Sequence, residues 1–259
     1  MYCKGCYLFI LLFALFSCQD NKQAQEEFIV NECEDNMNSV IESVTFHSLD
    51  SLLITAEIYC NNKEAEVFVL CHQARFSRGE YTETAQKFYD LGYNCFVIDQ
   101  RSGDEVNQVK NITAKRAKSQ GLPTEYLDAE QDIIAAVNYA TQFYGRKVIL
   151  VGSSYSASLV LKIAAENENV AKVVSFSPGE YFGEQLKLKE SIANLNIPVF
   201  ITSSKKEADE AKAIFDAIPS IEKTQFIPEG EGEHGSKALW AEKKDHQEYW
   251  DALLKFLAE

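Results

Sequence analysis

The sequence predicts an α/β domain in which helices cover both faces of a mostly parallel sheet, with antiparallel strands at its N-terminal start. The chain has 259 residues, of which 46% are hydrophobic, enough for one large domain with a full core. Short apolar runs alternate with longer stretches of helical periodicity, which is typical of parallel strands joined by helices. The first two apolar runs, 40–46 and 52–59, are joined by a short turn segment and are expected to pair antiparallel.

The remaining elements follow in alternation along the chain. Buried strands are expected at 67–70, 95–98, 148–151, 170–175, 198–202 and 224–227. Besides a helix directly after the strand 148–151, helices are expected at 80–91, 124–144, 186–195, 208–217 and 246–257.

Segment 104–123 shows no clear pattern, and long segments of this kind in compact domains often cover active sites. Four basic residues gather there in an otherwise acidic chain: Lys110, Lys115, Arg116 and Lys118. Two alternatives follow, a lid over residues 107–123 that attracts anionic substrates and a solvated surface loop.

The N-terminal segment differs from the rest of the chain. After Lys4, residues 7–16 form an apolar run that is too short to span a bilayer and is typical of a signal peptide. The run ends in Ser17-Cys18, which resembles the lipidation site of bacterial lipoproteins. The resemblance implies a signal peptide at 1–17, a lipidated Cys18, a polar tether at 18–37 and a folded domain at 38–259. We therefore expect an exported lipoprotein, anchored by its lipid to a membrane of the bacterial cell envelope. The alternative is an ordinary signal peptide in which Cys18 has no role.

Charge and cysteine content limit the partners of the chain. The net charge of −14 argues against nucleic acid, because such binding needs a basic surface. Cys71 and Cys95 lie within apolar strand patterns and are expected in the core. Cys33 and Cys60 flank the first two strands, and export permits a disulfide between them that the sequence alone does not establish. No Cys/His spacing indicates zinc.

The stretch 147–162 carries the strongest functional signal. An apolar run rich in β-branched residues is followed at once by a helical apolar stripe, so the chain must turn sharply. Gly152 and Ser156 flank Ser154 two positions before and after it, the Gly-x-Ser-x-Gly pattern of a nucleophile elbow with serine as its second small residue. Ser154 would stand at a helix N-terminus, where the N–H of Tyr155 faces an oxyanion. The alternative is a serine-rich turn that only caps the helix.

Candidate partners of Ser154 follow two later strands. Glu207 is the first acid after its strand, whereas Asp209 and Glu210 are ordinary first-turn acids of the next helix. His234 is the one of four histidines that follows the final strand, in a glycine-rich segment able to turn back to the sheet. Because the carboxyl ends of parallel strands meet at one edge of a sheet, we expect Ser154, Glu207 and His234 to meet there.

The order Ser, acid, His over three strand ends resembles the α/β-hydrolases, most closely the dienelactone-hydrolase-like serine esterases and prolyl-oligopeptidase-type catalytic domains. The resemblance covers the chain from about residue 40 to the C-terminus. It implies Ser154 as the nucleophile, His234 as general base and then acid, and Glu207 as the acid that orients the histidine. It also implies an oxyanion hole formed by the N–H groups of Tyr155 and Gln73. No metal or organic cofactor is implied.

Three points qualify the resemblance. The second oxyanion donor comes from the loop after the strand 67–70, where His72 and Ala74 are alternatives to Gln73. Serine replaces the second elbow glycine, and Glu207 stands where many members carry aspartate. Dienelactone hydrolases proper use a cysteine nucleophile, so the serine at position 154 does not imply their substrate.

The predicted function is hydrolysis of a small-molecule ester through an acyl-enzyme on Ser154. One alternative is a peptidase or acyltransferase that uses the same three residues. Another is a non-catalytic, lipid-anchored binding protein that retains the fold, against which the complete set of Ser154, Glu207 and His234 argues.

Overall fold

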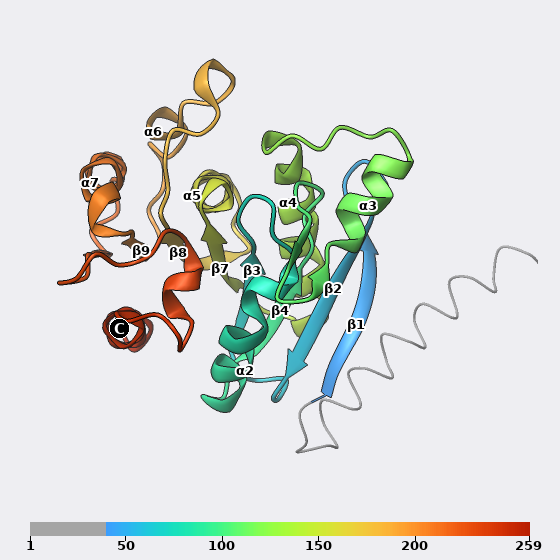
Figure 1. The fold of residues 1–259 in the computed structure, drawn as a ribbon, viewed down its shortest axis with the longest axis horizontal. Coiled ribbons are helices and arrows are strands. Elements are labelled where there is room, and N and C mark those ends of the chain that lie inside the picture. The colour runs from blue at the N-terminus through green and yellow to red at the C-terminus, as the bar shows by residue number, and fades with distance from the viewer. Residues whose placement is uncertain (1–39) are drawn as a thin grey trace, which may run out of the picture.

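The computed structural model describes residues 40–259, so the predicted signal peptide, Cys18 and the tether lie outside the described residues. Within this range eight strands form one sheet in the order β1-β2-β4-β3-β7-β8-β9-β10 (Figure 1). The bounds of these strands are β1 Val40–His47, β2 Leu53–Cys60, β3 Val67–Cys71, β4 Asn94–Ile98, β7 Val148–Ser153, β8 Val170–Phe176, β9 Val199–Thr202 and β10 Lys223–Phe226.

Strand directions agree with the sequence prediction. β1 and β2 are antiparallel, with Thr45 opposite Thr55, and β2 is also antiparallel to β4. From β4 to β10 every neighbouring pair is parallel. The predicted antiparallel start and the parallel sheet that follows are therefore confirmed, and the carboxyl ends of β3, β7, β8, β9 and β10 lie along one edge.

Helices cover both faces of the sheet (Figure 1). Their bounds are α2 Thr82–Asp90, α3 Ile112–Ser119, α4 Glu130–Tyr144, α5 Tyr155–Glu166, α6 Leu188–Ser191, α7 Ala208–Ala217 and α8 His246–Leu257. Because successive side chains of a strand point to opposite faces, β3 contributes to two separate cores. Val67 and Val69 belong to the core that also holds residues of α4, α5 and α7, whereas Phe68 and Leu70 belong to the core that holds residues of α2 and α8.

Segment 104–123 is largely folded, so the prediction of a segment without structure was wrong. A small hairpin precedes α3: β5 Glu105–Val106 and β6 Val109–Lys110. Asn111 caps α3, since its side chain accepts the Ala114 N–H at 2.7 Å. Arg116 donates to Leu53 O and Thr55 Oγ1 on β2, both at 2.8 Å, which fixes α3 against that strand.

The position of α3 bears on the lid hypothesis. α3 is bonded to β2, and β4 and β3 lie between β2 and β7 in the sheet. Three strand spacings of about 4.8 Å therefore separate β2 from β7. The guanidinium of Arg116 is also bonded to β2 rather than free to meet a substrate. Both observations argue against α3 as a lid that attracts anionic substrates through Arg116, whereas the hairpin before it is bonded to Ser77 and Gly79 in the segment after β3.

Two helices are shorter than predicted. The helix expected at 124–144 begins only at Glu130, after a 3-10 turn over Leu127–Ala129. The helix expected at 186–195 is reduced to α6, although Leu188, Ile192 and Leu195 are all fully buried. After α6 the chain forms a turn in which the Leu195 N–H donates to Ile192 O. This turn keeps Ile192 and Leu195 directed into the core although the segment is not helical.

Cys71 and Cys95 are free and completely buried, which confirms their prediction as core residues. Cys60 is engaged in a disulfide. The pairing of Cys60 with Cys33, which the sequence leaves open, is not tested, because Cys33 lies outside the described residues. None of the helices between residues 40 and 259 is long and apolar enough to cross a bilayer.

Candidate active site

The predicted elbow is present between β7 and α5. β7 ends at Ser153, α5 begins at Tyr155, and Ser154 between them has φ 60° and ψ −122°. A positive φ strains a residue other than glycine, by about 1–3 kcal/mol, and such strain gathers at functional sites. A Cβ at Gly152 would overlap the Ser156 backbone and lie 2.7 Å from the Ala157 Cα, so only glycine fits there. β7 and α5 therefore come close together at Gly152, as the small residues at positions 152 and 156 predict.

Ser156 explains why the second small residue of the elbow is serine. Its side chain is fully buried, and its hydroxyl donates to Cys71 O at 2.8 Å. The same oxygen accepts the Ser153 N–H at 2.8 Å. Ser156 thus joins the carboxyl ends of β3 and β7, a function that a glycine would lack.

Two tyrosines from other segments contact Ser154 or the residue that follows it. The Tyr126 ring stacks on Tyr155 with centroids 4.7 Å apart, and the Tyr181 hydroxyl interacts with the Ser154 side chain. Tyr181 also donates to Ser177 O at 2.8 Å. Burial raises the pKa of Tyr181 to about 12, so the phenol is neutral. Both tyrosines are 38% exposed.

Glu207 and His234 are in contact, as predicted. His234 Nδ1 bonds to Glu207 Oε1, while Glu207 Oε2 accepts the hydroxyls of Ser204 at 2.7 Å and Ser177 at 2.9 Å. Burial would raise the pKa of Glu207, but the bonds from His234, Ser204 and Ser177 outweigh burial and lower the pKa to about 2. Glu207 is therefore an anion at neutral pH. Asp209, the rejected candidate, lies exposed in the first turn of α7.

A capping box explains why this acid is glutamate. Glu207 is the third residue of a 3-10 turn, Lys205–Glu207, and its side chain reaches back to the Ser204 N–H at 3.2 Å. The longer side chain lets one carboxylate close the helix start and still meet His234.

The lowered pKa of Glu207 predicts a pH-dependent stability. The pKa of Glu207 in the folded chain, about 2, lies below its ordinary value of 4.5. Ionised Glu207 therefore stabilises the folded chain fully at pH values above 4.5. That contribution to stability is lost as the pH falls from about 4.5 through the folded-state pKa of about 2. We expect Glu207→Gln to remove it, so that the free energy of unfolding falls less steeply between about pH 4.5 and about pH 2. Urea unfolding at a series of pH values measures this. Asp209→Asn should keep the wild-type slope, and the same slope in Glu207→Gln would contradict the assignment.

The loop after β10 carries His234 onto the elbow. Gly235 has φ +75°, and a Cβ there would lie 2.6 Å from Ser153 Oγ and 2.7 Å from Gln73 Oε1. Its N–H donates to Ser177 Oγ at 3.0 Å. The backbone beside His234 therefore packs directly on the residue before Ser154, which only glycine permits.

Ser177 is a site residue that the sequence did not reveal. It follows β8, is buried, and has φ 56°. Its hydroxyl donates to Glu207 and accepts the Gly235 N–H, so one serine links the acid to the histidine loop. Nothing local distinguishes it from other serines at strand ends, because its role depends on three distant segments.

The oxyanion donors agree only in part with the prediction. Tyr155 is the first residue of α5, so its N–H has no acceptor within the helix. The Gln73 N–H, the other predicted donor, is already bonded to Glu80 Oε2 at 2.6 Å, which contradicts its assignment. The His72 N–H is bonded to Gln100 Oε1 at 2.9 Å. Within residues 40–259 the Ala74 N–H has no acceptor, so Ala74 is the remaining candidate of the three.

His72 has a structural environment. It is fully buried, its Nδ1 bonds to Gln73 O at 2.8 Å, and its Nε2 accepts the Gln100 N–H at 3.1 Å. Burial lowers the pKa of His72 to about 4, so the ring is neutral and bound to the backbone on both sides.

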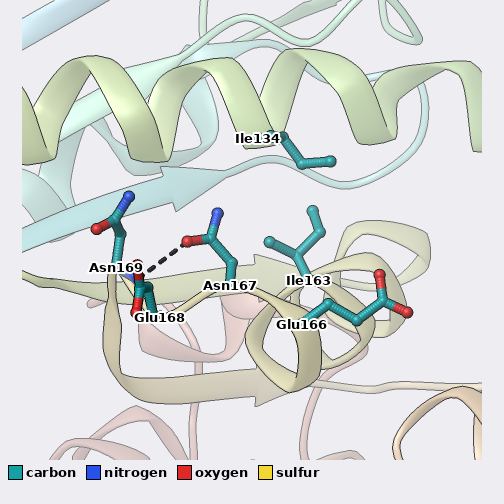
Figure 2. Close-up of a pocket in the computed structure, with 6 residues that line it drawn as sticks. All are labelled: Ile134, Ile163, Glu166, Asn167, Glu168 and Asn169. Carbon is teal, nitrogen blue, oxygen red and sulfur yellow. Dashed lines mark hydrogen bonds between the residues drawn. The ribbon is translucent and has the colours of Figure 1, made fainter.

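A pocket of about 490 Å³ lies elsewhere in the fold, and Figure 2 shows the residues that line it. It is lined by Ile134, Ile163, Glu166, Asn167, Glu168 and Asn169. These residues surround the C-terminal end of α5, whereas Ser154 caps its N-terminus. A helix of 12 residues is about 18 Å long, so this pocket is not part of the candidate site.

Residues 55–248 match the sequence profile of the dienelactone hydrolase family. No curated protein matches the chain.

Several solved structures are similar to the chain. An esterase from Pyrococcus furiosus has a TM-score of 0.64 at 12% identity, over 86% of this chain and 91% of that one. A dienelactone hydrolase from Anabaena variabilis has a TM-score of 0.65 at 15% identity, over 85% and 96% respectively. An acylaminoacyl peptidase from Pyrococcus horikoshii has a TM-score of 0.63 at 14% identity, over 87% of this chain but 42% of that one.

Proposed function

Because the chain belongs to the dienelactone hydrolase family, we propose that it is a serine hydrolase that cleaves an ester through an acyl-enzyme on Ser154. Its fold is the α/β-hydrolase fold, shared with the esterase, the dienelactone hydrolase and the peptidase described above. The observation that carries the proposal is the strained Ser154 at the start of α5, beside the loop that holds His234 against Glu207. A serine that only capped the helix would need neither the strain nor the ionised acid.

In the proposed reaction, Ser154 Oγ attacks the ester carbonyl carbon while His234 Nε2 accepts the hydroxyl proton. Ionised Glu207 bonds to Nδ1, keeps that nitrogen protonated before attack, and stabilises the imidazolium that forms. The N–H of Tyr155, joined by that of Ala74, would hold the oxyanion at the positive end of α5. His234 then protonates the leaving alcohol. Water deprotonated by His234 attacks the acyl group and releases the acid and Ser154.

The surroundings of Ser154 favour an ester with an apolar or aromatic group. Tyr181 interacts with the Ser154 side chain and is neutral, because burial raises its pKa to about 12, and Tyr126 stacks on Tyr155, the residue after Ser154; both tyrosines keep 38% of their surface exposed. A panel of butyrate, benzoate and carboxylate-bearing esters, with an acyl-peptide anilide as the peptidase alternative, tests the function and this preference together. Hydrolysis of the anilide above all esters would favour the peptidase alternative, and no hydrolysis in wild type would refute the proposal.

We also propose that the mature chain begins at a lipidated Cys18, on the strength of the apolar run that ends in Ser17-Cys18. Mass spectrometry of the membrane-extracted protein should find diacylated Cys18 at the N-terminus. Cys18→Ser should release soluble protein with unchanged ester hydrolysis, because the predicted tether separates Cys18 from the domain. An intact Met1 would contradict the proposal.

A further inference from the structure

Glu80 is a completely buried acid at the centre of the site that the proposed mechanism does not use. Its Oε1 accepts the hydroxyls of Ser153 and Ser236, both at 2.7 Å. Its Oε2 accepts the Gln73 N–H at 2.6 Å. A buried carboxylate with fewer partners would be costly, so this set of donors needs a physical explanation.

The three donors come from the three segments that the reaction needs. Ser153 immediately precedes Ser154, Ser236 lies two residues after His234, and Gln73 lies in the loop after β3. Ser153 Oγ also accepts the Ser236 N–H at 2.9 Å, so the bonds form one closed network. A single carboxylate therefore holds the elbow, the histidine loop and the loop after β3 at fixed positions.

The contacts fit the ionised form of Glu80. The Gln73 N–H can only donate, and the Ser153 and Ser236 hydroxyls are placed to donate to Oε1, so a carboxylate that accepts at both oxygens satisfies all three partners. Burial is the largest influence on the pKa of Glu80 and raises it above the ordinary value, and the bonds from Ser236, Gln73 and Ser153 and the nearby His234 offset only part of that rise. The other titratable neighbours of Glu80, Tyr81 and Tyr155, are neutral because burial raises the pKa of each phenol well above its ordinary value.

Titratable groups, some charged and some neutral, lie near His234 or near its partner Glu207. Glu207 contacts its ring, and Glu233 on the same loop is paired with Lys237 and Lys243. Tyr181 after β8 and Tyr249 of α8 are neutral phenols, since burial raises the pKa of each to about 12. Glu80 is thus a second acid near His234, behind Glu207, and among residues 40–259 it has no Lys or Arg partner.

We propose that Glu80 is a positioning residue for the reaction: a buried carboxylate that aligns Ser154 with His234 and favours the imidazolium formed when His234 accepts the serine proton. The inference rests on the proposed function, since it assigns a role within that serine-hydrolase site. It predicts that losing the charge slows the chemical step rather than substrate binding, because Glu80 is buried away from the substrate.

Glu80→Gln tests the role, because glutamine keeps the volume and removes the charge. We expect kcat to fall about 10- to 100-fold with KM nearly unchanged. We also expect the acid limb of the kcat/KM profile to move to lower pH by about one unit, because an anion that favours the imidazolium is gone. Glu83→Gln is the matched control. Glu83 lies on the same segment and accepts the Ala241 N–H at 2.8 Å, but it is exposed and should behave as wild type.

The outcomes separate a positioning role from a structural one. A Glu80→Gln protein that loses thermal stability but keeps the wild-type kcat and pH profile would overturn the proposal. If Glu80→Gln fails to fold by circular dichroism, Ser236→Ala decides, since it keeps the charge and removes one donor. It should fold and lower kcat about 10-fold, and an unchanged kcat would overturn the proposal. Wild-type protein without Ser154-dependent ester hydrolysis would instead refute the proposed function.

Discussion

Ser154→Ala and His234→Ala should each lower kcat for ester hydrolysis by about 10⁴- to 10⁶-fold, and the double variant should lose little more. The two side chains act as one unit, because a serine without its base and a base without its nucleophile are equally unproductive. Ser154→Ala should also fold as wild type. The backbone bond from Ser154 N–H to Phe176 O at 2.8 Å does not involve its side chain.

Steady-state kinetics of purified variants, with circular dichroism for folding, measures this effect. A double variant whose loss equals the product of the two single losses would show that the residues act independently. That result would contradict a shared role in one proton transfer.

Glu207→Gln should lower kcat by about 10²- to 10⁴-fold with little change in KM. The amide of the glutamine can donate an N–H to His234 Nδ1. Nδ1 would then be the acceptor, and the ring proton would lie on Nε2. In that tautomer His234 cannot take the proton of Ser154. The network of Ser204 and Ser177 around Glu207 should keep the fold intact, because glutamine retains an acceptor.

Asp209→Asn is the matched control for this variant. Asp209 is an acid only two residues later, yet it is exposed in the first turn of α7 and should have near wild-type kinetics. If Asp209→Asn were the damaging substitution, Glu207 would not be the orienting acid.

The sequence predicts those parts of the site that local residue types determine. Gly152 and Ser156 are small where a strand meets a helix, so the elbow could be inferred without coordinates. Glu207 and His234 could be inferred because each follows a strand whose carboxyl end must reach the same edge of the sheet. The contact between them in the structure agrees with that inference.

Features that depend on distant contacts could not be inferred in this way. The resemblance assigns the Gln73 N–H to the oxyanion, but Glu80, seven residues later at the start of a predicted helix, accepts it. Ser177 gives no local signal of its positive φ or of its bonds to Glu207 and Gly235. α3 has weak amphipathic character, and its place depends on the bonds from Arg116 to β2.

The most direct test of the account is labelling of the purified protein with a fluorophosphonate probe, which reacts only with an activated serine. Peptide mapping should place the label on Ser154, and labelling should vanish in Ser154→Ala and fall sharply in His234→Ala. It should persist in Asp209→Asn and Glu83→Gln. A folded wild-type protein that resists the probe, or a label on another serine, would contradict the claim that Ser154 is the nucleophile.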